Sequence, residues 1–380
     1  MTVSDRVIVF GGNHHNTLGV IRSLGKKGIS TILLLVDDDD RVSYVSKSKY
    51  IAEVHKYPSY ESGVQYLENL ATSPKERMVV ICCSDGASSA VDMHYDVLAR
   101  SFYIPNSAKQ GEISRLMSKE VLADEAKKAG LAVPQTWLSE NGVIPDGVTF
   151  PCILKPLYSK DGSKEDICVC RYLDELKDYF QNKHCNRLQI QAFIEKDFEY
   201  QLIGCSIKGG EQVIIPGVSK VIRPSKTSNT GFLLYDRLDD SYPIQQVNDM
   251  LSKMKYSGLF SAEFLRDKEG NDYFMEVNFR NDGNAIAVTA AGVNLPFLWV
   301  QSALSDNPID TSALEIHPVY VMPEYDDLVH VLHHNISLKT WLRDMKRSDC
   351  YMEYDKADKK PFFYRTMDMV SVLLKKFFKR

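Results

Sequence analysis

Four side chains that could bind a metal ion and phosphate lie close together in residues 261–284. One precedes and three follow a turn-forming cluster at residues 268–272, and apolar residues flank that cluster on both sides. This pattern predicts a β-hairpin. The four side chains are Glu263, Glu276, Asn278 and Arg280.

The register of this hairpin depends on its loop. A loop at residues 269–270 places Glu263 opposite Glu276, whereas a loop at residues 270–271 places Glu263 opposite Asn278. Because side chains alternate with period two along a strand, all four side chains share one face in either register. A loop with an odd number of residues would remove the direct opposition.

Two carboxylates and an amide oxygen on one face form a hard-oxygen site. Such a site suits Mg²⁺ that keeps water and nucleotide phosphates as its other ligands. Arg280 adds a clamp for phosphate or carboxylate. The alternative is a solvated polar face of a hairpin at the edge of a sheet. The upstream Glu263, paired with the acidic strand that follows the turn, and the polar loop at residues 281–284 favour the metal site.

Two lysines are candidates for the phosphates of the same nucleotide. Lys155 ends a β-prone run, residues 150–155, and precedes Pro156, which restricts its backbone. Lys119 lies in the first turn of the helix predicted at residues 118–129, where backbone N–H groups favour anions. Alone, either lysine is an ordinary surface residue, but with the hairpin both become expected phosphate ligands.

The first hundred residues alternate between strand and helix. Apolar runs at residues 7–10, 31–36 and 79–83 read as strands, and residues 18–27 have helical spacing. This βαβ order predicts an N-terminal doubly wound α/β domain. Ligands bind at the carboxyl ends of such strands. The candidates there are Asn13, His14 and Asp85, for which a plain turn is an equally good interpretation.

The organisation changes after residue 150. Short β-prone runs separated by hairpin turns, such as the turn at residues 208–211, indicate an antiparallel sheet with a few helices. The chain therefore combines an α/β domain with an α+β part.

The composition excludes some functions. The 380 residues carry a net charge of −4, so nucleic acid is not an expected partner. The eight cysteines lack zinc-site spacing, and most lie in apolar runs, which favours a reducing, cytoplasmic location. We expect no signal peptide, and no run approaches the about 20 apolar residues of a membrane span.

The order of these features resembles the ATP-grasp superfamily. The chain has a helix-start lysine, a strand lysine before proline, a hinge with a Phe-Ile pair, and the E…E-x-N-x-R hairpin. The matching residues are Lys119, Lys155, Pro156, Gln191, Ala192, Phe193, Ile194, Glu263, Glu276, Asn278 and Arg280. The resemblance implies a pre-ATP-grasp domain (1–115), an ATP-grasp domain (116–305, with lobes 116–190 and 191–305 that clamp the nucleotide) and a C-terminal extension (306–380).

The resemblance also implies roles for individual residues. The hinge, Gln191 to Ile194, would hold adenine, and Glu199 would bind the ribose. Mg²⁺, with Mn²⁺ as a substitute, would bind Glu263, Glu276 and Asn278. The implied catalytic residues are Arg280, Lys155 and Asn281. Asp282 would contact substrate, as would Arg223 in a segment, residues 223–231, that corresponds to a mobile loop of the family.

Within the superfamily the chain is most similar to D-aspartate ligases and the carboxylate–amine ligases of bacterial cell-surface assembly. The segments on which this similarity rests are residues 6–12, 18–23, 46–50, 83–86 and 131–134. The implied activity joins a carboxylate to an amine through an acyl phosphate and releases ADP and phosphate. The alternatives are an ATP-dependent phosphotransferase and a non-catalytic nucleotide-binding regulatory protein.

The C-terminal segment predicts an amphipathic helix with a basic face. Its apolar stripe is Met367, Val370, Leu373, Leu374 and Phe377, and its basic residues are Lys375, Lys376, Lys379 and Arg380. The helix could pack on the protein or on a partner subunit, as in a homodimer. It could also lie on the anionic inner face of the membrane.

Overall fold

The N-terminal sheet has the parallel, two-sided arrangement that the sequence predicts. The structure, a computed structural model, describes residues 7–37, 43–71, 77–156, 168–182, 187–225, 230–305 and 308–378. Five strands follow the order β3-β2-β1-β4-β5, all parallel. They are β1 (Val7–Gly12), β2 (Thr31–Val36), β3 (Ile51–Tyr57), β4 (Met78–Cys82) and β5 (Phe102–Tyr103).

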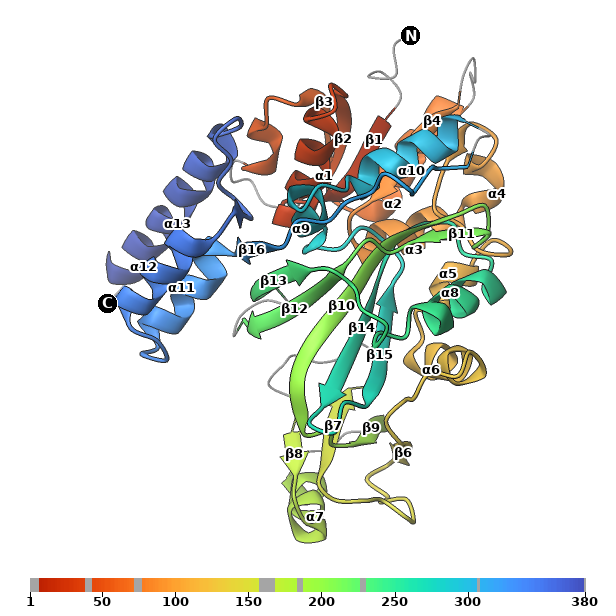
Figure 1. Cartoon of the computed structure of the whole chain (residues 1–380), viewed down its shortest axis with the longest axis vertical. Coiled ribbons are helices and arrows are strands. Elements are labelled where there is room, and N and C mark those ends of the chain that lie inside the picture. Colours follow the sequence, from red (N-terminus) through yellow and green to blue (C-terminus); the bar gives the residue numbers. More distant parts are fainter. Residues whose placement is uncertain are drawn as a thin grey trace.

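Helices cover both faces of this sheet (Figure 1). Alternate residues of β1 explain why: Val7 and Val9 join one core, and Ile8 and Phe10 join the other. The helices are α1 (His15–Gly25), α2 (Tyr60–Ala71), α3 (Asp85–Met93) and α4 (Tyr95–Leu98). Helix α1 begins three residues before the apolar pattern because the His14 side chain caps it.

A long mixed sheet forms the centre of the molecule. Its order is β15-β14-β10-β12-β13-β16-β17, with β11 on the edge of β10. Only β16 and β17 pair in parallel. The strands are β10 (Lys196–Ile207), β11 (Gln212–Ile214), β12 (Val218–Arg223), β13 (Phe232–Asp236), β14 (Gly258–Asp267), β15 (Asp272–Asn278), β16 (Val319–Met322) and β17 (Cys350–Tyr351).

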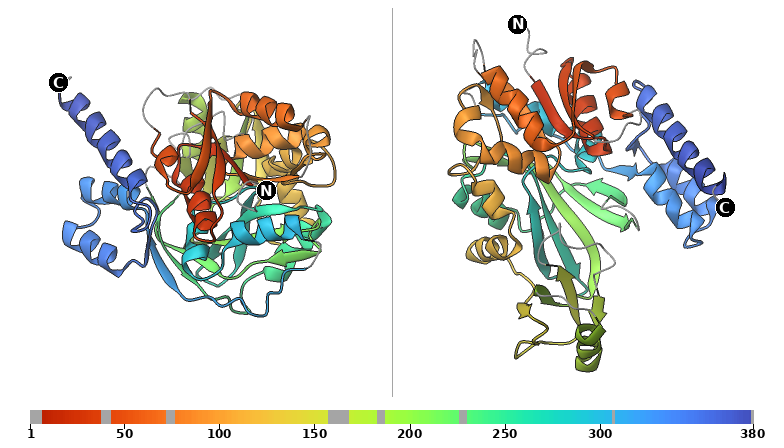
Figure 2. Two further views of the ribbon diagram at one scale, coloured as in Figure 1. Left: turned by 90° about the horizontal axis from the view of Figure 1, so that it is seen from above. Right: turned by 180° about the vertical axis from the view of Figure 1, so that it is seen from behind.

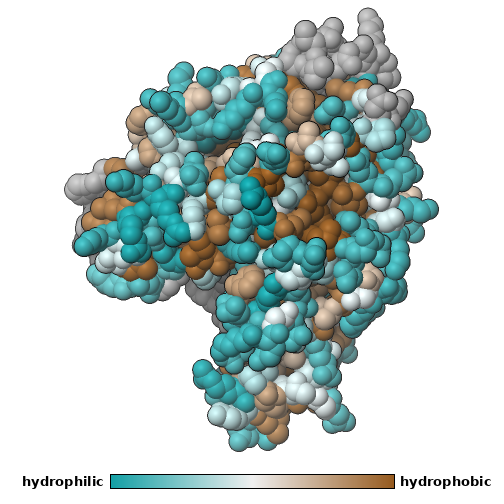
Figure 3. Space-filling model, viewed as in Figure 1, coloured by the Kyte–Doolittle hydropathy of each residue, from teal (hydrophilic) through white to brown (hydrophobic). Residues whose placement is uncertain are grey.

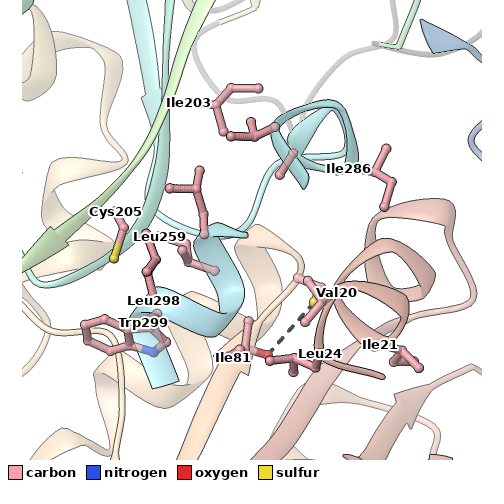
Figure 4. Packing of buried hydrophobic residues seen from close by; sticks show 14 of the residues in the cluster. Val20, Ile21, Leu24, Ile81, Ile203, Cys205, Leu259, Ile286, Leu298 and Trp299 are labelled. Carbon is pink, nitrogen blue, oxygen red and sulfur yellow. Dashed lines mark hydrogen bonds between the residues drawn. The ribbon is translucent and has the colours of Figure 1, made fainter. Parts of the chain in front are cut away.

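Separate helices pack on the two faces of the large sheet. One group shares a core with Tyr200, Phe264 and Phe274, and it comprises α5 (Glu112–Leu116), α6 (Lys119–Lys128) and α8 (Ile244–Lys253). The other, α9 (Ala285–Ala290) and α10 (Leu295–Leu304), lies between the large sheet and the N-terminal domain. Figure 4 shows this packing, in which α1 and β4 meet the sheet through Val20, Leu24, Ile81, Ile203, Leu259, Ile286, Leu298 and Trp299. The two parts therefore share one continuous core.

A small lobe projects from the far end of the large sheet (Figure 1). Its antiparallel sheet has the order β6-β9-β7-β8, with α7 (Leu173–Asn182) beside it. The strands are β6 (Thr136–Glu140), β7 (Cys152–Pro156), β8 (Cys168–Cys170) and β9 (Arg187–Ala192). The lobe has its own small core around Cys152, Leu154 and Ile190. The α/β domain followed by a two-lobed α+β part confirms the predicted fold class.

The C-terminal segment is more than the predicted extension with one helix. It adds β16 and β17 to the large sheet and forms α11 (Glu324–Leu332), α12 (Leu338–Arg347) and α13 (Lys360–Phe378). Figure 2 shows α13 pointing away from the body of the molecule. Within the described ranges, none of the helices has the length and apolar character needed to cross a membrane.

The C-terminal helices carry exposed apolar side chains. Brown patches interrupt the mostly hydrophilic surface in Figure 3, and Leu338 and Leu342 of α12 are exposed. Met367 and Val370 of the predicted stripe are exposed as well. The side chains of Leu373, Leu374 and Phe377 and the basic residues at the end of the chain lie outside the described part. A subunit or membrane contact through this helix stays a prediction.

A buried ion pair fastens the C-terminal segment to the N-terminal domain. Arg22 Nε lies 3.1 Å from Asp358 Oδ2, and both side chains are 2% exposed. The Asp358 carboxylate also accepts hydrogen bonds from the Ser48 hydroxyl and the Lys49 backbone N–H. Arg22 Nη2 donates to the Asp358 carbonyl at 2.8 Å. Residues after β17 are therefore held against α1.

Replacing Asp358 by alanine is expected to lower the free energy of unfolding by about 3 kcal/mol, because it removes the carboxylate that balances the buried Arg22 charge. Urea denaturation measures this change. The Asp355→Ala variant, which breaks the more exposed pair with Lys26, is the control and should lose at most about 1 kcal/mol. Equal losses in the two variants would contradict the anchoring role of Asp358.

Candidate active site

The hairpin β14–β15 places Glu263 opposite Glu276 and Ser261 opposite Asn278. This is the first of the two predicted registers. The loop is nevertheless odd: Asp267 pairs with Asn271, and Gly270 adopts a left-handed φ of 88°. The pairing shifts between Glu263 and Phe264, so a bulge offsets the odd loop and restores the direct opposition of the glutamates.

Burial of the two glutamates outweighs the positive charges near them. Glu263 Oε1 accepts hydrogen bonds from Gln201 Nε2 and Asn278 Nδ2, each at 3.0 Å. Burial, followed by the charge of Glu276, raises the pKa of Glu263, and burial also raises the pKa of Glu276. A divalent cation between them would reverse this effect.

The protein side chains fit Mg²⁺ only if water and phosphate supply the remaining ligands of the metal ion. Among the described residues, no group of three or more His, Cys, Asp or Glu side chains is arranged to hold a metal ion. Asn278 Oδ1 accepts a hydrogen bond from Arg280 Nη2 at 2.9 Å and retains a second lone pair. Two carboxylates and one amide oxygen leave several coordination positions for water and phosphate, as Mg²⁺ requires.

The two predicted phosphate lysines lie within electrostatic range of Glu276. Lys155, at the end of β7, donates to Gln191 Oε1 at 2.9 Å. Burial and the neighbouring Lys119 lower the pKa of Lys155 to about 8, while Glu276 acts in the opposite direction. Lys119 also lowers the pKa of Glu276. The structure therefore brings Lys119, Lys155 and the hairpin acids together.

A cavity of about 360 Å³ lies between the small lobe and the large sheet. Its size falls within the range of small-molecule sites. The predicted hinge forms one wall and the two glutamates another. Its apolar surface comes from Ile153, Val221, Leu265 and Met275.

One backbone N–H of the hinge has no backbone partner in the part of the chain that the structure describes. The Ala192 N–H donates to the Gln135 carbonyl at 2.8 Å, and the Phe193 N–H donates to the Pro151 carbonyl at 3.0 Å. Ile194 N–H has no partner among the described residues. An adenine edge would therefore meet the backbone at Ile194. Glu199, the predicted ribose ligand, lines the same cavity and pairs with Lys196.

Arg280 joins the hairpin to the N-terminal domain. Its Nε donates to Asp85 Oδ1 at 2.9 Å, and its Nη1 lies 3.5 Å from Asp282 Oδ2. Asp282 is fixed in turn by the Ser261 hydroxyl and the Asn284 N–H. The structure thus brings Asp85 and Asp282, both predicted substrate contacts, to the arginine.

Two predicted site residues are engaged elsewhere. Asn281 is 3% exposed, and its Nδ2 donates to Asn16 Oδ1 at 2.5 Å. Asn13 Oδ1 accepts from the Ser43 hydroxyl and the Val45 N–H. The Asn281 amide joins the two domains, and the Asn13 amide fixes a loop within the N-terminal domain. The catalytic role predicted for Asn281 and the substrate contact predicted for Asn13 therefore lack support from this geometry.

Arg223 is also placed differently from the prediction. Its guanidinium binds Asp327 of α11 at 2.7 Å and Asp344 of α12 at 3.0 Å. All three guanidinium nitrogens are engaged in these bonds. Arg223 therefore connects β12 to the C-terminal helices instead of reaching a substrate. Lys226 and Asn229 of the predicted mobile loop lie outside the described residues.

His14 lies at the start of α1, as the strand-end prediction implies. Its Nδ1 accepts the Asn16 N–H at 3.2 Å, and its ring lies 3.9 Å from the His15 ring. Burial lowers its pKa, and the charges of Asp326, Arg280, Arg365 and Asp282 also act on it. His14 therefore lies within electrostatic range of both the hairpin end and the C-terminal helices.

Sequence reasoning missed the polar residues that hold the acids. Gln201 of β10 donates to Glu263 and accepts from Asn284 Nδ2 at 2.7 Å. Both residues are buried. A polar side chain at the edge of the apolar run of β10 was the available signal for Gln201.

The lowered pKa of Lys155 predicts a pH dependence for nucleotide binding. Phosphates bind the ammonium form, which is lost in the free protein as the pH rises through about 8. The affinity for ADP should fall about tenfold between pH 7 and pH 9. Calorimetric titration in EDTA measures this. Lys155→Met should bind more weakly and lose most of the dependence, and an unchanged dependence in that variant would contradict the assignment.

Comparisons with solved structures define the fold. The chain resembles an L-amino acid ligase from Bacillus licheniformis (15% identity, TM-score 0.61, covering 83% of this chain and 78% of that one). It resembles N5-carboxyaminoimidazole synthetase from Staphylococcus aureus (15%, 0.64, 87% and 85%). It also resembles biotin carboxylase from Campylobacter jejuni (14%, 0.63, 83% and 74%). The chain has the ATP-grasp fold.

The sequence comparisons cover less of the chain. No family model matches the chain. A formate-dependent phosphoribosylglycinamide formyltransferase of Bacteroides fragilis is 24% identical over 214 residues, which cover 53% of this chain and 54% of that protein. The match thus spans about half the length of this curated relative.

Proposed function

We propose that the chain is an ATP-dependent ligase that joins a carboxylate to an amine and releases ADP and phosphate. The observation that carries this proposal is that Lys155, Glu263 and Glu276 line one cavity between the lobes, with Lys119 and Arg280 within electrostatic range of Glu276. Solved structures with the same fold include an N5-carboxyaminoimidazole ribonucleotide synthetase with ADP and a biotin carboxylase domain with MgADP. ATP and Mg²⁺ are therefore the proposed cosubstrate and metal.

The protein's contribution to this reaction is positioning and charge neutralisation. Lys155 and Lys119 would hold the phosphates, and the Ile194 N–H would fix the adenine edge. Mg²⁺ on Glu263, Glu276 and Asn278 would supply the charge that neutralises the phosphate oxygens.

The reaction proceeds in two displacements. A carboxylate oxygen attacks the γ-phosphorus as the bond to ADP breaks, which gives an acyl phosphate. The amine nitrogen then attacks the acyl carbon, phosphate leaves, and the nitrogen loses a proton. Arg280 would stabilise the charge on the transferred phosphoryl group in both steps, because Asp85 and Asp282 fix its guanidinium.

The sequence resemblance to D-aspartate ligases supports a narrower proposal about the substrates and the pathway. Amino acids and cell-envelope precursors are the first substrates to test, and a role in cell-surface assembly follows if they react. This proposal rests on motifs in the sequence.

A screen for ADP release tests the proposed function. Amino acids and cell-envelope precursors would be offered in pairs with Mg·ATP, and products identified by mass. The proposal expects ADP release that needs both partners and a product equal to their sum minus one water. A product that has gained a phosphoryl group instead would indicate a phosphotransferase. No ADP release with any pair would favour a nucleotide-binding regulatory protein.

A further inference from the structure

A second cavity, of about 230 Å³, is separate from the candidate active site. The two cavities share no lining residue. Arg77, which lines the second cavity, directly precedes β4, whereas Asp85 of the candidate active site follows the carboxyl end of the same strand. The second cavity therefore lies at the opposite end of the N-terminal sheet, in the region of α4 and the turn between β10 and β11 (Figure 1).

Three parts of the chain surround this cavity. The N-terminal domain contributes Arg77 and residues between 95 and 106, the large sheet contributes the end of β10, and α10 contributes a third side. An isolated β-bridge joins the N-terminal domain to the large sheet here, because the backbone groups of Asn106 and Ser257 exchange hydrogen bonds of 2.9 and 2.8 Å. A ligand in the cavity would therefore contact both domains.

The inner wall of the cavity is apolar. Its buried apolar side chains, each 5% exposed or less, are Phe102, Ile104, Ile207 and Trp299. Two of them are aromatic, so a flat apolar group can pack against them. The neighbouring polar groups already have partners, since Asn106 Nδ2 donates to the Ile104 carbonyl at 3.1 Å and the Ser257 hydroxyl accepts the Gly209 N–H at 2.7 Å.

Arg77 places a fixed positive charge at the exposed side of the cavity. Its Nη2 donates to the carbonyls of Ala99 (2.8 Å) and Phe102 (2.7 Å), and its guanidinium lies 3.9 Å from the centre of the Tyr103 ring. Its Nε and Nη1 have no partner among the described residues. The described residues that line the cavity include no aspartate or glutamate, and Lys208 adds a second basic side chain. The cavity therefore favours an anion.

We propose that this cavity binds a small organic anion, whose carboxylate accepts hydrogen bonds from Arg77 and whose flat apolar group packs against Phe102 and Trp299. A carboxylate matches the single charge of a guanidinium, and the N–H groups on Nε and Nη1 can donate to it. The volume is below that of drug-sized sites, which favours a ligand with one ring. This inference does not depend on the proposed ligase function, because the cavity is separate from the proposed ATP site.

The first test uses benzoate, which has one ring and one carboxylate. The wild-type protein should bind benzoate with a Kd of about 1 mM or below, and calorimetric titration measures this affinity. Benzamide has the same shape without the charge and should bind at least about tenfold more weakly. Equal affinities for the two probes would contradict recognition by a positive charge.

The second test separates the charge from the apolar wall. Arg77→Gln should weaken the binding of benzoate at least about tenfold and change that of benzamide less than about twofold. Arg100→Gln, at an exposed arginine of the same domain that does not line the cavity, is the matched control and should bind both probes as the wild type does. An equal loss for both probes in Arg77→Gln would contradict the contact between Arg77 and the carboxylate.

The third test locates the bound probe. Benzoate should change the tryptophan fluorescence of the wild-type protein, and Trp299→Phe should remove that change. Ser302→Phe places a ring in the cavity from α10 and should abolish binding, while thermal melting shows that the protein stays folded. Benzoate binding that Ser302→Phe leaves intact would contradict this location.

ADP provides the last control, because it should bind the other cavity. The affinity for benzoate should be the same with and without saturating ADP. Competition between benzoate and ADP, or no binding of benzoate to the wild-type protein at about 10 mM, would overturn the inference.

Discussion

Replacing Glu276 by glutamine is expected to lower the rate of ATP turnover about 1,000-fold while the protein stays folded. Glutamine has the same shape but removes one of the two carboxylates that face each other across β14 and β15. A bound metal ion contributes several kcal/mol to charge stabilisation in such a reaction, and each 1.36 kcal/mol changes the rate about tenfold. The Mg²⁺ concentration needed for half-maximal rate should rise as well.

The control for this variant lies on the same hairpin. Glu269 is exposed in the turn, so Glu269→Gln should retain the wild-type rate and Mg²⁺ requirement. Thermal melting of both variants reports whether the fold is intact. A Glu276→Gln protein that turns over ATP within about threefold of wild type would exclude Glu276 as a metal ligand.

Replacing Arg280 by lysine should lower kcat about 100-fold, which is the size expected when one fixed donor to a developing charge is lost. Lysine keeps the charge but cannot reach Asp85, Asn278 and Asp282 together, as the guanidinium does. KM for ATP should change less than about threefold, because the nucleotide contacts are assigned to other residues.

Steady-state kinetics with both substrates measure the effect of Arg280→Lys. Arg115→Lys, at an exposed pair with Glu112, is the control and should be kinetically silent. If Arg280→Lys raised KM for ATP and left kcat unchanged, Arg280 would be a nucleotide-binding residue instead of a group that acts on the reacting phosphate.

The local parts of the fold could be predicted from sequence because their signals are local. The apolar run at residues 31–36 is β2, and period-two alternation placed Glu263, Glu276 and Asn278 on one face. The bulge near Glu263 could not be predicted, because it depends on how the whole strand packs. Its effect was to preserve the predicted opposition in spite of an odd loop.

The contacts that could not be predicted join distant segments. Gln201 reaches Glu263 only because β10 pairs with β14, and no local pattern encodes that order. The position of Arg223 in the sequence corresponds to a mobile loop in the superfamily that the chain resembles. In the structure, however, Asp327 and Asp344, more than a hundred residues later in the chain, bind Arg223. The segment after β17 was interpreted as an extension, yet the Arg22–Asp358 pair brings that segment to α1.

The transfer of ¹⁸O from a labelled substrate carboxylate tests the central claim most directly. If the carboxylate attacks the γ-phosphate and the amine then displaces phosphate, one labelled oxygen appears in the inorganic phosphate for each amide formed. Mass spectrometry of the phosphate measures this transfer. Our account predicts one ¹⁸O per phosphate with the wild-type protein, and amide formation without labelled phosphate would contradict it.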